Sequence, residues 1–178
     1  METFIRAYKS FHRDERGSAT LAGILFALIL VVLAAAIVDV YRVQDIRTFA
    51  YGAANDAALR GASFGRDWNR FTATGELGLD TAIATNAATN ALTELMQTRG
   101  LATYTYRIEV LPDPGGGTIN DFPPVARAEL RQRSDWSESE PAVGVYVEIS
   151  VPTLLFGLIN GNQPIAVHAF AAAGVIER

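Results

Sequence analysis

Residues 18–38 read SATLAGILFALILVVLAAAIV, a run of 21 residues that contains no charged side chain. An α-helix rises about 1.5 Å per residue, so this run makes a helix of roughly 31 Å, the thickness of a bilayer's hydrocarbon core. Lipid offers no partner for a backbone polar group, and a segment that spans it is therefore helical. We predict a transmembrane helix at residues 18–38, between a leader at residues 1–17 and a separate domain at residues 39–178.

Two other interpretations of this segment compete with an anchor. A buried core helix is disfavoured because the run is long and apolar on every face. A cleavable secretory signal has an apolar region of about 7–15 residues followed by small residues. The small residues Ala34, Ala35 and Ala36 could provide such a cleavage site, but the length of the run favours an anchor.

Basic residues near this segment predict its orientation. Four precede it and two follow it closely: Arg6, Lys9, Arg13 and Arg16 before it, and Arg42 and Arg47 after it. Lys and Arg are enriched on the cytoplasmic side of membrane helices. We therefore expect a cytoplasmic leader and a single pass through the cytoplasmic (inner) membrane, with residues 39–178 forming an extracytoplasmic domain.

Composition argues against several functions. The chain has 15 basic and 19 acidic residues without a basic patch, so we expect no nucleic-acid partner. It has no cysteine, which excludes disulfides and thiol chemistry, and its two histidines, His12 and His168, lie at opposite ends of the chain. We expect no metal, no cofactor and no small-molecule substrate.

The apolar spacing after residue 38 predicts that the helix continues to about Arg60. A break follows up to Gly78, in which Trp68 and Phe71 are expected to cover the core or, alternatively, to lie at the lipid surface. A second helix is predicted from Leu79 or Asp80 to about Thr98. Its expected buried face is given by an apolar spacing of four: Leu79, Ile83, Ala87, Ala91 and Leu95.

The rest of the chain has the features of β-strands. Four segments are β-branched, aromatic or alternating in polarity: residues 103–111, 125–133, 143–151 and 165–175. The fold class predicted is α+β, with a long N-terminal transmembrane helix continuing into a small exported domain that has one further helix and an antiparallel sheet of about four strands. The apolar residues 154–159 are interpreted as core, or else as an exposed patch for a partner or a membrane surface.

Three stretches together resemble the tight-adherence (Tad) pilus-assembly proteins, the minor-pseudopilin-like group of the type IV pilus superfamily. The first is ERGSATLAGILFALIL, in which Arg16-Gly17 leads straight into the apolar helix. The second is the segment after the anchor, where Asp39 matches an Asp that closes the helix and residues 55–59 match an Ala-Asp-Ala-Ala-Leu-like string. The third is residues 145–178, which are similar to a closing pair of strands around a Pro-containing apolar loop. The resemblance covers the first 60 residues and roughly the last 35.

The resemblance implies a leader-peptidase cleavage between Gly17 and Ser18. It also implies a Glu at the fifth mature position, where this chain has Ala22. This departure weakens the prediction of cleavage and of incorporation into a filament, because the Glu is the group implied to pair with a neighbour's terminal amine.

The function expected is that of a membrane-anchored, non-enzymatic structural or assembly component of a Tad-type pilus. Its partners would be the lipid bilayer and other membrane proteins of a pilus or larger complex. The alternative is an accessory single-pass subunit of another membrane complex, such as an energy-converting one. An enzyme is disfavoured, because a catalytic triad would have to use His168 and no nucleophile elbow is present.

Overall fold

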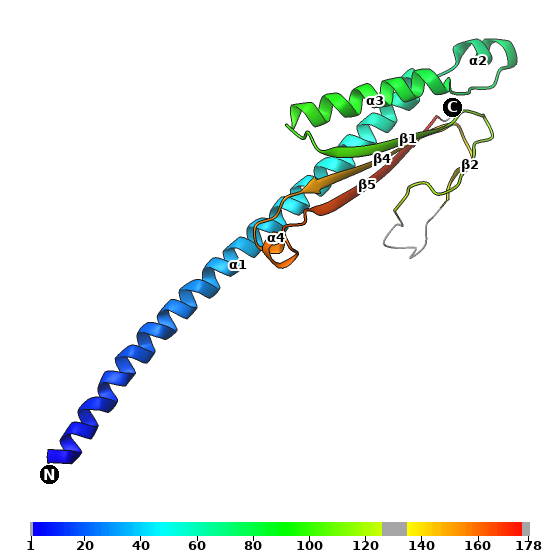
Figure 1. Ribbon diagram of the computed structural model, residues 1–178. Helices are drawn as coiled ribbons and strands as arrows, with labels where there is room; N and C mark the ends of the chain where they lie inside the picture. Colours follow the sequence, from blue (N-terminus) through cyan, green and yellow to red (C-terminus); the bar gives the residue numbers. More distant parts are fainter. Residues whose placement is uncertain (1, 126–134, 176–178) are drawn as a thin grey trace. The chain divides into compact units, whose positions relative to one another are not determined.

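The computed structural model of the chain describes residues 2–125 and 135–175 (Figure 1). Its elements follow one another along the chain as four helices and five strands within the described residues: α1 (Glu2–Phe64), α2 (Trp68–Thr74), α3 (Thr81–Thr98), β1 (Tyr104–Leu111), β2 (Gly117–Ile119), β3 (Trp136–Glu138), β4 (Ala142–Val151), α4 (Leu155–Ile159) and β5 (Ile165–Gly174). The chain divides into two compact units. One contains the chain up to Arg42 with Pro152–Gln163, and the other contains Val43–Val151 and the chain from Pro164 onward.

Helix α1 is longer than predicted at both ends. The sequence prediction placed it from Ser18 to about Arg60, whereas the helix runs from Glu2 to Phe64. The prediction that the helix continues beyond residue 38 is confirmed, because α1 extends for 25 residues past Asp39; the match of Asp39 to an Asp that closes the helix therefore does not hold. Residues 19–34 are all exposed, and α1 is the one helix in the described part of the chain that is long and apolar enough to cross a membrane.

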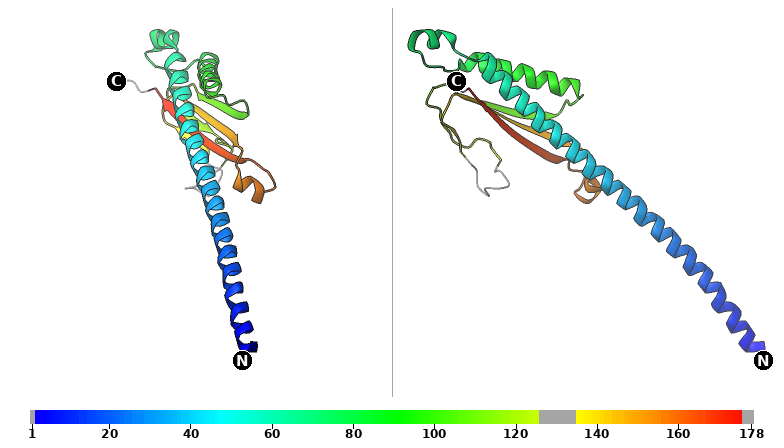
Figure 2. Two further views of the ribbon diagram at one scale, coloured as in Figure 1. Left: turned by 90° about the vertical axis from the view of Figure 1, so that its left-hand side faces the viewer. Right: turned by 180° about the vertical axis from the view of Figure 1, so that it is seen from behind.

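The core of the second unit lies between two helices and one face of a three-stranded sheet. The strand order is β1-β4-β5, and both pairs are antiparallel. Two helices contribute to the core over this face: α3, and the part of α1 that follows Arg42. Figures 1 and 2 both show these helices beside the sheet. On β4, the expected alternation is confirmed, since Val145, Val147 and Ile149 all point into this core.

The α+β class is thus correct, but the sheet differs from the prediction. It has three strands in the described residues, at the predicted places, rather than about four. The predicted strand at residues 125–133 lies outside the described part of the chain from Ala126 onward. A separate two-stranded sheet joins β2 to β3, and neither strand is among the four predicted segments. Burial explains β3, because Trp136 is only 3 % exposed and packs in a second apolar cluster on the opposite face of the main sheet.

Helix α3 is confirmed between its predicted ends. Its predicted buried face is correct in part: Leu79 and Ala91 are buried and Leu95 packs against the core, but Ile83 is not buried. The Asp80 carboxylate accepts a hydrogen bond from the backbone N–H of Ile83 at 3.0 Å and caps the helix. The Ile83 side chain is 51 % exposed, whereas Ala84 and Ala88 are completely buried. The small residues face inward because α1 approaches closely: a Cβ on Gly61 would lie 3.1 Å from that of Ala88.

Helix α2 occupies the segment that was predicted to be a break. None of its residues is buried. Trp68 is 58 % exposed and Phe71 is 38 % exposed, and their rings meet edge to face at 6.0 Å. The expectation that this pair covers the core is therefore wrong.

Candidate functional site

The Asp39 carboxylate is the central group of the first unit. Its Oδ1 accepts a hydrogen bond from the backbone N–H of Leu154 at 2.7 Å, and its Oδ2 accepts from those of Leu155 and Phe156 at 2.7 and 3.0 Å. These three N–H groups lie at the start of α4, and Leu154, the N-cap residue that precedes the helix, makes no side-chain cap. The first N–H groups of a helix have no partner within it. A side chain of α1 therefore supplies the cap that α4 lacks.

Electrostatics favour the charged form of this carboxylate. Asp39 has no exposed surface, and desolvation by burial raises its pKa. The three backbone N–H donors and the Arg42 guanidinium act in the opposite direction and prevail, so that the pKa lies below its ordinary value. Arg42 also donates to the carbonyl of Pro152 at 3.3 Å. Two side chains of α1 thus hold the beginning of the 152–163 loop.

The loop held in this way presents apolar side chains to the outside. Leu154, Leu158 and Ile159 are 58 %, 75 % and 74 % exposed. The interpretation of residues 154–159 as core is wrong for these three residues. Gly157 is the buried residue of α4. The exposed patch, which was the alternative interpretation, is the one that the structure contains.

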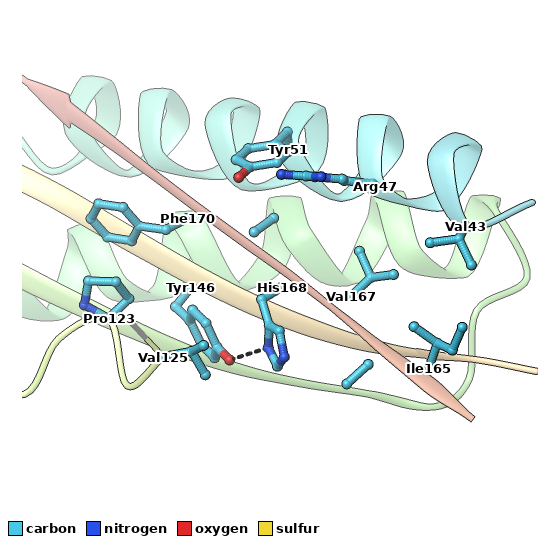
Figure 3. Close-up of a pocket in the computed structure, with 12 residues that line it drawn as sticks. Val43, Arg47, Tyr51, Pro123, Val125, Tyr146, Ile165, Val167, His168 and Phe170 are labelled. Carbon is cyan, nitrogen blue, oxygen red and sulfur yellow. Dashed lines mark hydrogen bonds between the residues drawn. The ribbon is translucent and has the colours of Figure 1, made fainter. Parts of the chain in front are cut away.

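A cavity of about 310 Å³ is present in the second unit (Figure 3). It lies along β5 and is bordered by α1 on one side and by Tyr146 and His168 on the other. The Tyr146 hydroxyl donates to Glu148 Oε2 at 3.2 Å, and its oxygen lies 2.8 Å from His168 Nδ1. Among the other lining residues, Arg47 is stacked over the ring of Tyr51.

The Tyr146 phenol is the hydrogen-bonded centre of this polar cluster. Burial, followed by the charge of Glu148 and its hydrogen bond, raises the pKa of Tyr146. A phenol with a raised pKa keeps its proton and is not activated as a nucleophile or base. The hydroxyl beside His168 belongs to Tyr146 rather than to a serine. These hydrogen bonds hold the Tyr146 and His168 side chains in their orientation at the cavity wall.

The remaining predicted site lies within α1. Gly17 and Ser18 are part of its helical backbone, and cleavage between them stays a prediction. Among the described residues, no three His, Asp or Glu side chains gather as a potential metal site. Sequence reasoning missed the role of Asp39, although one signal was present: an acidic residue directly follows the uncharged run.

Comparison with known proteins identified no relative: no family model matches the chain, and neither a curated protein nor a solved structure matches it significantly.

Proposed function

We propose that this protein is a membrane-anchored, non-enzymatic structural or assembly component of a Tad-type pilus, of the pseudopilin-like kind. Residues 18–38 of α1 span the cytoplasmic membrane, the leader lies in the cytoplasm, and the second unit lies outside. Its partners are the bilayer and other membrane proteins of the pilus.

The observation that carries the anchor is an apolar stretch of helix that nothing in the described structure covers. Residues 19–34 are exposed, and they include large aliphatic side chains such as Leu25, Ile29 and Leu33 at 54 %, 53 % and 53 % exposure. Apolar surface in water costs about 25 cal/mol per Å². A helix that is apolar on all sides and unburied is stable when lipid or other apolar helices surround it.

The proposal of a pilus role rests on the resemblance of three stretches in their order along the chain. The fold supports it at the third of them, whereas at the second stretch α1 continues past Asp39 instead of ending there. The closing strands β4 and β5 pair along their whole length and are connected in the chain by the segment that begins at Pro152.

Three measurements on the native host test this function. Alkaline washing of isolated membranes should leave the protein in the pellet, and its intact mass should show whether the chain begins at Met1 or Ser18. A start at Ser18 supports processing as a pilin-like subunit. Deleting the coding sequence should abolish or strongly reduce Tad pili on the cells. A soluble protein would overturn the anchor, and normal piliation would overturn the pilus role while leaving the anchor intact.

A further inference from the structure

We propose that the 154–159 segment, α4 together with Leu154, is a second membrane contact, seated at the boundary between lipid headgroups and acyl chains and held there by Asp39. This inference rests on the anchor part of the proposed function and is independent of the pilus part. It assigns a binding surface for lipid to a loop that lies more than 100 residues beyond the anchor in the chain.

The position of the Asp39 contact defines the level of this segment. Asp39 directly follows Val38, the last residue of the uncharged run. It bonds to the first N–H groups of α4, so α4 begins beside the end of the membrane-spanning stretch. On α1, the neighbouring Tyr41 is 77 % exposed, and tyrosine is a residue enriched at the membrane–water interface.

The chemistry of the loop fits this level. Residues 152–164 read PTLLFGLINGNQP and contain no charged side chain. Leu154 and Leu158 are four positions apart and therefore lie on one side of the helical turn, with Ile159 beside them. All three are more than half exposed. The polar Asn160, Gly161 and Asn162 follow directly, which gives the segment an apolar part and a polar end.

The hydrogen bonds of Asp39 solve the main difficulty that such a segment meets in the interface. Water becomes scarce towards the acyl chains, and an unpaired backbone N–H is costly there. The first three N–H groups of this segment are all paired with the buried carboxylate. The segment can therefore present its leucines to lipid without exposing unpaired donors at its start.

Lipid is favoured over a partner protein because the patch is small and continuous with the anchor. It consists of three aliphatic side chains on one short turn. A stable protein–protein interface usually buries about 800 Å² on each partner and is ringed by polar side chains. The exposed side chains of Ile37 and Val38 lie at the same end of the anchor, so that lipid around the anchor also meets the loop.

The absence of cysteine in the chain permits a direct test with single labels. Leu158→Cys in the full-length protein is labelled with an environment-sensitive fluorophore and reconstituted into vesicles of phosphatidylcholine and phosphatidylglycerol. Some vesicles contain lipids that carry a quencher near the headgroup, and others carry it deep in the acyl chain. Leu28→Cys places a label in the anchor. Phe64→Cys places one at an apolar position outside the anchor, where the Phe64 side chain is 70 % exposed.

The label at position 158 should be quenched more strongly by the shallow lipid than by the deep one, and aqueous iodide should reach it poorly. The label at position 28 should be quenched by the deep lipid. With Asp39→Ala added, position 158 should lose most of its lipid quenching while position 28 keeps its own.

Each contrary result has a separate meaning. An unquenched label at position 28 would overturn the anchor itself. A quenched position 28 with a position 158 open to iodide would overturn the lipid contact alone. A position 158 shielded from iodide but not quenched by lipid would show that protein covers the patch, which also overturns it. Unchanged quenching in the Asp39→Ala background would refute the role of Asp39.

Discussion

Asp39 and Leu154 are 115 positions apart in the chain and are joined by a 2.7 Å hydrogen bond from the Leu154 backbone N–H to the carboxylate. This contact turns a charged residue at the end of an apolar run into the cap of a distant helical turn. A charged acceptor makes stronger hydrogen bonds than a neutral one. The link between α1 and the 152–163 loop should therefore depend on both the charge and the shape of this side chain.

Replacing Asp39 by Asn tests that dependence. Asn keeps one acceptor oxygen but replaces the other by an NH₂ group that faces backbone N–H donors, so the charge and at least one of the three bonds are lost. We expect chymotrypsin to cleave the 154–159 segment roughly tenfold faster in detergent, the order expected for lost charge-assisted bonds. Asp56→Asn is the matched control, because Asp56 lies on the same helix with a 42 % exposed side chain that pairs with Arg60. Equal cleavage of the two variants would show that Asp39 does not hold the loop.

The same contact predicts a pH dependence. The pKa of Asp39 is lowered in the folded chain, so its contribution to stability is complete above the unfolded value of about 3.9. It is lost as the pH falls below that value and through the lowered folded pKa. Cleavage of the loop by pepsin should therefore accelerate as the pH falls below about 4. The Asp39→Asn variant, which has no carboxylate at this position, should lack this part of the acceleration.

Close packing of α1 against α3 predicts opposite effects for two glycines. A Cβ on Gly65 would lie 2.5 Å from that of Ala84 and 2.7 Å from the carbonyl oxygen of Gly61. Gly65→Ala should therefore lower the free energy of unfolding by about 1–3 kcal/mol. Gly52 lies within α1 with nothing within 4 Å of such a Cβ, and Gly52→Ala should raise stability by up to about 1 kcal/mol. Urea unfolding in detergent measures both, and a stable Gly65→Ala variant would contradict the close approach.

The two tryptophans should differ in their importance for stability. Trp136 is 3 % exposed, and its ring meets those of Phe122 and Phe170 at 5.7 and 6.2 Å. Trp136→Ala should cost about 3–5 kcal/mol. Trp68 is 58 % exposed on α2, and Trp68→Ala should change stability by no more than about 0.5 kcal/mol. Thermal melts of the two variants give the comparison, and a similar loss in both would mean that α2 is packed more tightly than its exposure indicates.

Local patterns in the sequence predicted the elements that depend on local physics. The apolar run of 18–38 has the length of a membrane helix wherever it occurs. Helix α3 begins at an Asp80 cap and ends before Gly100, whose φ of 71° suits glycine. The alternation in β4 follows from the two-residue period of a strand. Each of these signals lies within a few residues of the structure that it specifies.

Features that depend on a distant partner could not be found in this way. Both Ile83 and Ala84 are apolar, and only the close approach of Gly61 and Gly65 decides that the alanine is buried. Strand β3 exists because Trp136 packs against Phe122 and Phe170 from other parts of the chain. The partners of Asp39 lie on a loop that no local pattern connects to it.

The Tyr146 phenol provides a last prediction, which concerns the stability of the fold at high pH. Burial, with the charge of Glu148, raises its pKa, so the unfolded chain loses this proton first as the pH rises above about 10. The stabilisation is complete below that value and declines as the pH rises towards the folded pKa. Tyr146→Phe should cost about 1 kcal/mol at neutral pH, since it removes the hydrogen bonds to Glu148 and His168. The variant should also lack part of the decline in the free energy of unfolding above about pH 10. Urea unfolding measures this free energy, and tyrosinate absorbance follows the ionisation of the phenol. The free energy of unfolding of wild type and variant could instead decline in parallel above that pH. The phenol would then not be protected by its surroundings, and the cavity wall would be more open to water than the 4 % exposure of Tyr146 implies.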